Sequence, residues 1–274
     1  MKRIPILCAV FLLLLSLSGC TPAPEPAPDP YANEYAQADL SLLESGVVRV
    51  RYTGDGESRV KLQLTKTDGT DYNYDLNTAG EWEQFTLTEG EGEYTLRVLE
   101  NVQENRYMPV FDCILTLELD DPLEPFRQSN QFVSFTADSP VAELAGELTE
   151  GLETEGEKVT AVFDHVVESL TYDREQAATV ETGYLPDVDD ILARGKGICF
   201  DYAALMTAML RSQRVACKLA VGWAGKEYHA WVEVLSEAGE WEVKDPTFVS
   251  ANPGNEKVLE FVRDPGNYEV RYYY

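Results

Sequence analysis

Three residues of the types used in nucleophilic catalysis, Cys199, His229 and Asp245, follow one another in the C-terminal part of the chain. A cysteine attacks as its thiolate, an imidazole accepts and returns a proton, and a carboxylate holds the imidazole in one orientation. The chain has only two histidines, so few other arrangements of this kind are possible. These three residues therefore form the candidate site, provided that the fold brings them together.

Cys199 follows a turn that contains Gly195 and Gly197, and it opens an apolar run that predicts a helix. A helix N-terminus presents unpaired N–H groups that stabilise negative charge. The same groups could bind the oxyanion formed when a sulfur attacks a carbonyl. Taken alone, however, the position is better explained by a buried cysteine that faces the core with Ala203 and Met206.

His229 and Asp245 lie in two strand-like runs, 228–235 and 241–248, separated by a polar stretch that contains a glycine. This pattern predicts a β-hairpin. If its turn centres on Glu237, His229 lies directly opposite Asp245, close enough for a carboxylate to hold an imidazole. A slip of one residue would place the two side chains on opposite faces of the hairpin.

The surroundings of this hairpin predict an α+β domain over residues 122–274. Apolar residues recur at helical spacing, and a further strand is expected just before the hairpin. The other histidine, His165, falls on the outer flank of one helix, where a surface role is expected. The predicted helices cover 139–152, 159–170, 187–193 and a stretch beginning at 199, and the preceding strand covers 217–223.

Residues 41–121 have a different pattern, with apolar residues at every second position and glycine-containing turns between the runs. Six or so short strands of this kind predict a small antiparallel β-sandwich. Cys113 lies on the apolar face of the last run and is expected to be a core residue. No constellation in this region suggests chemistry, so it is expected to be a spacer or a binding module.

The first 40 residues predict a targeting signal followed by a flexible tether. Residues 1–19 form a signal peptide, and Leu17-Ser18-Gly19-Cys20 resembles the lipobox of bacterial lipoproteins. Cys20 would then carry lipid and anchor the protein to a bacterial cell membrane, outside the cytoplasm. An ordinary signal peptide or a transmembrane anchor is the alternative. Residues 20–40 are acidic and proline-rich, so a disordered tether is expected.

Charge and cysteine content exclude several classes of function. The formal net charge of −26 argues against nucleic acid as a partner, and it favours solubility outside the cell or basic partners. The cysteines that remain after processing, Cys113, Cys199 and Cys217, do not have the spacing of a metal site. We expect no disulfide, although one disulfide and one free thiol is the alternative, and we expect a monomer without metal or cofactor.

The candidate residues lie in three motifs: GICFDYAAL at 197–205, YHAWVE at 228–233 and WEVKDPT at 241–247. These motifs resemble the transglutaminase-like superfamily of papain-like cysteine enzymes, and the resemblance covers about residues 159–274. It implies that Cys199 is the nucleophile, that His229 is the general base and then the acid, and that Asp245 orients His229. Tyr172 also matches a family position, where it would line the site or assist the oxyanion, unless it only packs.

The chemistry that this resemblance implies is acyl transfer from a peptide or protein substrate. Hydrolysis of the resulting thioester would make the protein a surface-anchored cysteine hydrolase, either a peptidase or an amidase. Attack by a lysine amine would make it a crosslinking transglutaminase instead. The third alternative is a non-catalytic binding or scaffolding lipoprotein that has kept the fold.

Overall fold

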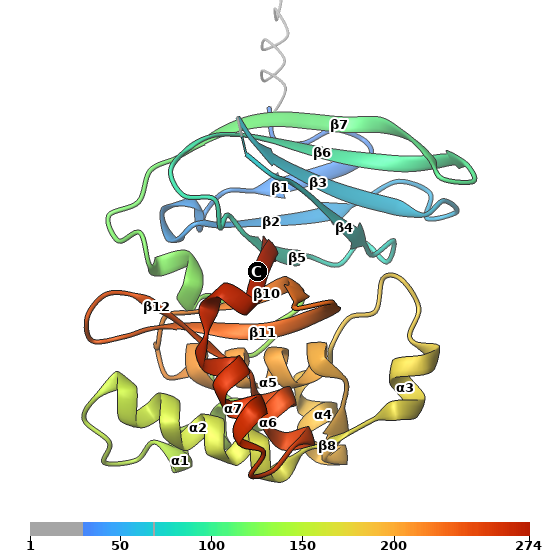
Figure 1. Cartoon of the computed structure of the whole chain (residues 1–274). Coiled ribbons are helices and arrows are strands. Elements are labelled where there is room, and N and C mark those ends of the chain that lie inside the picture. The colour runs from blue at the N-terminus through green and yellow to red at the C-terminus, as the bar shows by residue number, and fades with distance from the viewer. Residues whose placement is uncertain (1–29, 68) are drawn as a thin grey trace, which may run out of the picture.

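Alternating apolar residues build an antiparallel β-sandwich in the N-terminal part of the chain. The computed structural model, which describes residues 30–67 and 69–274, contains two sheets here, with strand orders β1-β2-β5 and β4-β3-β6-β7 (Figure 1). Apolar side chains from both sheets fill one shared core, as the alternation predicts. The strands are β1 (Ala36–Asp39), β2 (Val47–Tyr52), β3 (Val60–Lys66), β4 (Asp71–Leu76), β5 (Glu83–Thr86), β6 (Gly92–Gln103) and β7 (Arg106–Leu117).

Strand β1 lies within residues 20–40, the range predicted to be a disordered tether. It pairs with β2 in antiparallel register, and Ala36 is fully buried. The tether prediction is therefore wrong for these residues, because the prolines end at Pro30 and the following backbone N–H groups are free to join a sheet. The predicted signal peptide and Cys20 lie outside the described residues.

The C-terminal part of the chain combines helices with a second antiparallel sheet of order β12-β11-β10-β13. Figure 1 shows this sheet between the sandwich and the helices. The helices are α1 (Pro140–Leu148), α2 (Glu155–Ser169), α3 (Arg174–Thr179), α4 (Val188–Arg194), α5 (Cys199–Ser212), α6 (Pro246–Ala251) and α7 (Glu256–Arg263). The strands are β8 (Thr171–Tyr172), β9 (Lys196–Gly197), β10 (Cys217–Ala224), β11 (Glu227–Leu235), β12 (Trp241–Lys244) and β13 (Tyr268–Tyr273).

Helix α5 is the central element of this α+β domain. It is buried along nearly its whole length and packs between the other helices and strands β10 and β11. The predicted helices correspond to α1, α2, α4 and α5, while α3, α7 and β13 were not predicted. The structure thus has the predicted α+β class in this part of the chain, and two further antiparallel sheets precede it. The boundary at residue 121 stays a prediction.

The two cores meet through aromatic side chains. Phe132 and Tyr274 pack against both cores, with ring centroids 4.5 Å apart. Phe132 also contacts Tyr74 of the sandwich at 5.7 Å and Phe200 of α5 at 5.4 Å. Among the described residues, no helix has the length and apolar character required to cross a bilayer.

Candidate active site

Cys199 is the first residue of α5 and is partly exposed. The preceding helix α4 ends at Gly195, whose φ of +63° lies in the left-handed region that favours glycine. Residues 196–197 then pair with β8, and α5 begins directly afterwards. The turn therefore places the sulfur at the N-terminus of a helix, where the first N–H groups have no partner within the helix.

His229 on β11 and Asp245 form a buried pair. The ring nitrogen Nε2 donates to Asp245 Oδ2 at 2.9 Å, and the two side chains are 5% and 0% exposed. Asp245 also accepts the hydroxyl of Tyr268 at 3.0 Å and the N–H of Phe248 at 3.0 Å. With three donors, the carboxylate is fixed in place, and it fixes the imidazole in turn.

The imidazole ring lies between two aromatic rings. Phe248 stacks on it with centroids 4.3 Å apart and an interplanar angle of 18°, and Trp231 lies 6.4 Å away at 16°. Burial lowers the pKa of His229, but the Asp245 carboxylate and the Cys199 sulfur raise it by more, so this pKa lies above its ordinary value. The site therefore favours a protonated imidazole beside the sulfur.

The register of the hairpin differs from the predicted one by two residues. Val243 lies opposite Glu233 rather than Trp231. The cause is a three-residue turn in which the Ser236 N–H donates to the Glu240 carbonyl and Gly239 has a φ of +81°. The prediction that His229 lies directly opposite Asp245 is therefore wrong. An even shift keeps His229 on the predicted face, and Asp245, which follows the last paired residue Lys244, reaches the imidazole through its hydrogen bond with Nε2.

The predicted strand 241–248 is also wrong beyond Lys244. Asp245 is the N-cap of α6, and its side chain accepts the N–H of Phe248. Pro246 cannot donate to a strand ladder, but it suits the first position of a helix. Asp245 thus serves the cap and the imidazole together, with one oxygen for each.

Cys199, His229 and Tyr172 line one cavity of about 600 Å³. Burial and then the Cys199 sulfur raise the pKa of Tyr172, so its phenol stays protonated and able to donate at neutral pH. His165 lies on α2 and does not line this cavity.

The other two described cysteines are buried in the two cores, and all three thiols are free. Burial raises the pKa of Cys113 and that of Cys217 to about 11, so both thiols remain protonated at neutral pH. Cys113 packs in the core of the sandwich, as its place in the alternating pattern predicts. Cys199 is thus the thiol that is open to a substrate.

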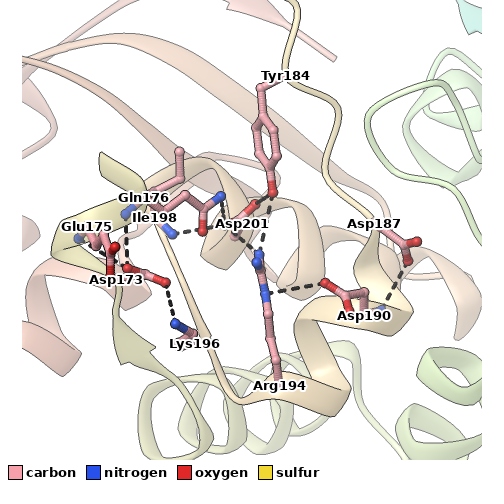
Figure 2. A network of polar contacts seen from close by, with 10 residues as sticks. All are labelled: Asp173, Glu175, Gln176, Tyr184, Asp187, Asp190, Arg194, Lys196, Ile198 and Asp201. Carbon is pink, nitrogen blue, oxygen red and sulfur yellow. Dashed lines mark hydrogen bonds and ion pairs between the residues drawn. The ribbon is translucent and has the colours of Figure 1, made fainter. Parts of the chain in front are cut away.

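A buried carboxylate two residues after Cys199 organises the turn that carries the sulfur. Asp201 is 0% exposed and accepts the Ile198 N–H at 2.9 Å and the Tyr184 hydroxyl at 2.7 Å. Gln176 and Arg194 donate to it at 3.0 and 3.2 Å (Figure 2). Sequence reasoning gave Asp201 no role, although an acidic residue in the first turn of a helix is a capping signal.

Figure 2 shows a second polar contact, an ion pair, on the other side of this turn. Asp173 caps α3, and it forms an ion pair with Lys196 of β9 at 2.9 Å. The backbone N–H of Gln176 and then Lys196 hold the pKa of Asp173 below its usual range. The segments on both sides of Cys199 are therefore held by buried or half-buried polar contacts. Within the described ranges, no group of three His, Cys, Asp or Glu side chains is arranged to hold a metal.

Comparison with known proteins gives one family match, over the stretch that carries this site. Residues 142–246 match the sequence model of the transglutaminase-like superfamily. The matched stretch contains Cys199, His229 and Asp245.

Two solved structures are similar at a distance. One is described as a candidate cysteine protease from Cytophaga hutchinsonii, with 20% identity and a TM-score of 0.41, over 70% of this chain and 67% of that one. The other is described as a candidate protease from Parabacteroides distasonis ATCC 8503, with 13% identity and a TM-score of 0.32, over 73% and 64%. Both likenesses are too distant to bear on activity. No curated protein matches the chain.

Asp245→Asn is expected to lower the pKa of His229, because an amide lacks the negative charge that stabilises the imidazolium. Asparagine still caps α6, so the fold should persist. The ring then loses its proton at a lower pH than in the unmodified protein. The rate of any step that needs the protonated ring therefore begins to fall at a lower pH as the pH is raised. A ¹H NMR titration of the ring signals measures this shift, with His165 as the reference. A pKa of His229 that is equal or higher in the variant would contradict this assignment.

Proposed function

We propose that this protein is a surface-anchored cysteine hydrolase, a peptidase or amidase that works by acyl transfer through Cys199, His229 and Asp245. The observation that carries the proposal is the buried His229–Asp245 hydrogen bond beside a sulfur at a helix N-terminus, on one cavity. The transglutaminase-like domain over residues 142–246 supports the same class of chemistry.

The reaction begins with the Cys199 thiolate and the His229 imidazolium. The sulfur attacks the amide carbonyl, and N–H groups at the start of α5 stabilise the oxyanion. As the C–N bond breaks, His229 gives its proton to the leaving amine, and a thioester remains on Cys199. Water then attacks the thioester and gives a proton to His229, the C–S bond breaks, and the carboxylic acid leaves with the thiolate restored.

Crosslinking differs from hydrolysis only in the second acceptor, because an amine would then attack the thioester in place of water. Hydrolysis needs no binding site for a second substrate, so we favour water. A labelled primary amine supplied with a protein substrate separates the two outcomes. Stable incorporation of the amine would favour the transglutaminase reaction, and its absence during turnover would favour hydrolysis.

The proposed location is the outer side of a bacterial membrane, with lipid on Cys20. Support comes from the basic start, the apolar run and the lipobox-like LSGC sequence. A strongly acidic chain at −26 suits a protein that acts on peptides or proteins and does not bind nucleic acid. We propose that it acts as a monomer.

Iodoacetamide labelling tests the catalytic reading. Cys199 should react about 10-fold faster or more than an ordinary thiol at neutral pH, because it is expected to be a thiolate paired with His229. His229→Ala should remove this advantage. Mass spectrometry of the labelled peptides gives the rates, and buried Cys113 and Cys217 should stay unlabelled in the folded protein. If Cys199 reacts like an ordinary thiol and His229→Ala leaves its rate unchanged, the proposal fails.

A further inference from the structure

The cavity beside Cys199 is not confined to the transglutaminase-like domain. Tyr74 and Asn73 of strand β4 line it together with Cys199 and His229. Strand β4 is an edge strand of its sheet, so its rim is not covered by another strand. At about 600 Å³, the cavity is within the range of pockets that hold ligands of roughly 300–1,000 Å³, so it has room for more than the scissile amide.

The inner wall of this cavity is aromatic. Phe200, the residue after Cys199, contacts Phe132, and Phe132 contacts Tyr74 and Tyr274. The rings therefore run without a gap from the start of α5 to the core of the sandwich. Such a wall binds large apolar or aromatic groups through area and ring contacts.

The charges around the cavity argue against an acidic ligand. Lys61 is already paired with Asp75 at 2.6 Å, and the further acid Glu181 lies on the same lining. No unpaired cation among the lining residues is left to neutralise a carboxylate. A buried carboxylate without a cation costs free energy, whereas a neutral apolar group can enter the cavity without that cost.

The outer rim of the cavity is held in place. The segment between α3 and α4 crosses to β4, where Gly183 approaches Asp75 so closely that a Cβ would lie 2.7 Å from the carboxylate oxygen. One residue later, the Tyr184 hydroxyl donates to buried Asp201 at 2.7 Å. The packing against β4 and the hydrogen bond to Asp201 both restrain this segment, which favours a cavity that is formed before a substrate arrives.

We propose that this cavity is a specificity site, built jointly by the β-sandwich and the transglutaminase-like domain, for a bulky apolar or aromatic side chain next to the amide that Cys199 attacks. The inference rests on the proposed hydrolase function. It gives the sandwich a part in substrate selection, where the sequence predicted only a spacer or a binding module. Peptides with phenylalanine, tyrosine or leucine beside the scissile amide should be cleaved about 10- to 100-fold more efficiently than those with glycine or aspartate.

Two neighbouring alanines of α3 allow a matched test. Both Ala177 and Ala178 are exposed, but only Ala177 lines the cavity. Ala177→Trp should fill the cavity and lower kcat/KM for the preferred peptides about 10-fold or more, while Ala178→Trp should match the unmodified protein. Iodoacetamide is small, so it should still label Cys199 in both variants.

The sandwich wall is tested in the same way on β4. Asn73 lines the cavity and Asp71 does not, although both are exposed on the same face of the strand. Asn73→Trp should lower kcat/KM for the preferred peptides, and Asp71→Trp should not. If Asn73→Trp leaves kcat/KM for the preferred peptides unchanged, the proposal that the β-sandwich forms part of the cavity wall is overturned.

The failure of this inference differs from the failure of the proposed function. If the unmodified protein cleaves peptides without preference, or if Ala177→Trp cleaves the preferred ones normally, the specificity site is overturned while the hydrolase remains. If Cys199 lacks enhanced reactivity and no peptide is cleaved, the hydrolase itself is wrong, and the specificity site falls with it.

Discussion

Cys199→Ala is expected to lower kcat/KM for peptide hydrolysis by about 10⁴-fold or more, because a methyl group cannot form the thioester. The change removes one partly exposed sulfur at the start of α5, so the fold should persist. A protein substrate carrying quenched fluorophores, such as labelled casein, provides the assay. Thermal unfolding followed by circular dichroism shows whether the variant is folded.

Cys113→Ala is the matched control for this experiment. Its thiol is buried in the core of the sandwich, away from the cavity, so the variant should keep its activity. If folded Cys199→Ala hydrolyses the substrate as fast as the unmodified protein, Cys199 is not the nucleophile. Equal losses in the two variants would indicate damage to the fold rather than to the chemistry.

Asp201→Ala is expected to lower the free energy of unfolding by about 3–5 kcal/mol, since it removes a buried carboxylate that satisfies four donors. The Ile198 N–H and the Tyr184 hydroxyl would lose their acceptor in a closed site. Equilibrium unfolding in urea measures the loss from the midpoint and the slope.

Asp190→Ala provides the control, because both carboxylates pair with the same cation. Asp190 lies 3.5 Å from Arg194 and its side chain is 63% exposed, whereas that of Asp201 is 0% exposed. Removing an exposed partner should cost about 1 kcal/mol or less. Comparable losses in the two variants would show that burial of Asp201 does not decide its contribution.

The elements of this fold could be predicted where the information is local. Alternation over 41–121 predicted the sandwich, and helical spacing predicted α1, α2, α4 and α5. The pairing of His229 with Asp245 was predicted from a strand pattern, but it arises differently, because Asp245 lies beyond the end of β12 and caps α6. The register depends on which turn the polar stretch adopts, and Gly239 with its positive φ permits a three-residue turn in place of one centred on Glu237.

The polar support of the site could not be predicted, because it joins segments that are distant along the chain. Asp201 accepts hydrogen bonds from Gln176 of α3 and Arg194 of α4. The sequence around Asp201 does not indicate which distant residues these are. The aromatic wall is less predictable still. Tyr74 and Tyr274 are 200 positions apart and yet their ring centroids lie 5.9 Å apart. Burial of this kind follows from tertiary packing rather than from local pattern.

The close approach of Gly197 to Asp201 has a consequence for the evolution of this chain. A Cβ on residue 197 would lie 2.5 Å from the Cβ of Asp201, nearer than packed carbon atoms can come. A side chain at position 197 therefore requires glycine at position 201 or a shift of the whole turn. Glycine at position 201 would remove the acceptor of four hydrogen bonds, so glycine at position 197 should be kept in related chains that keep this turn. A glycine two residues before the cysteine would then mark this site in sequences that lack a structure.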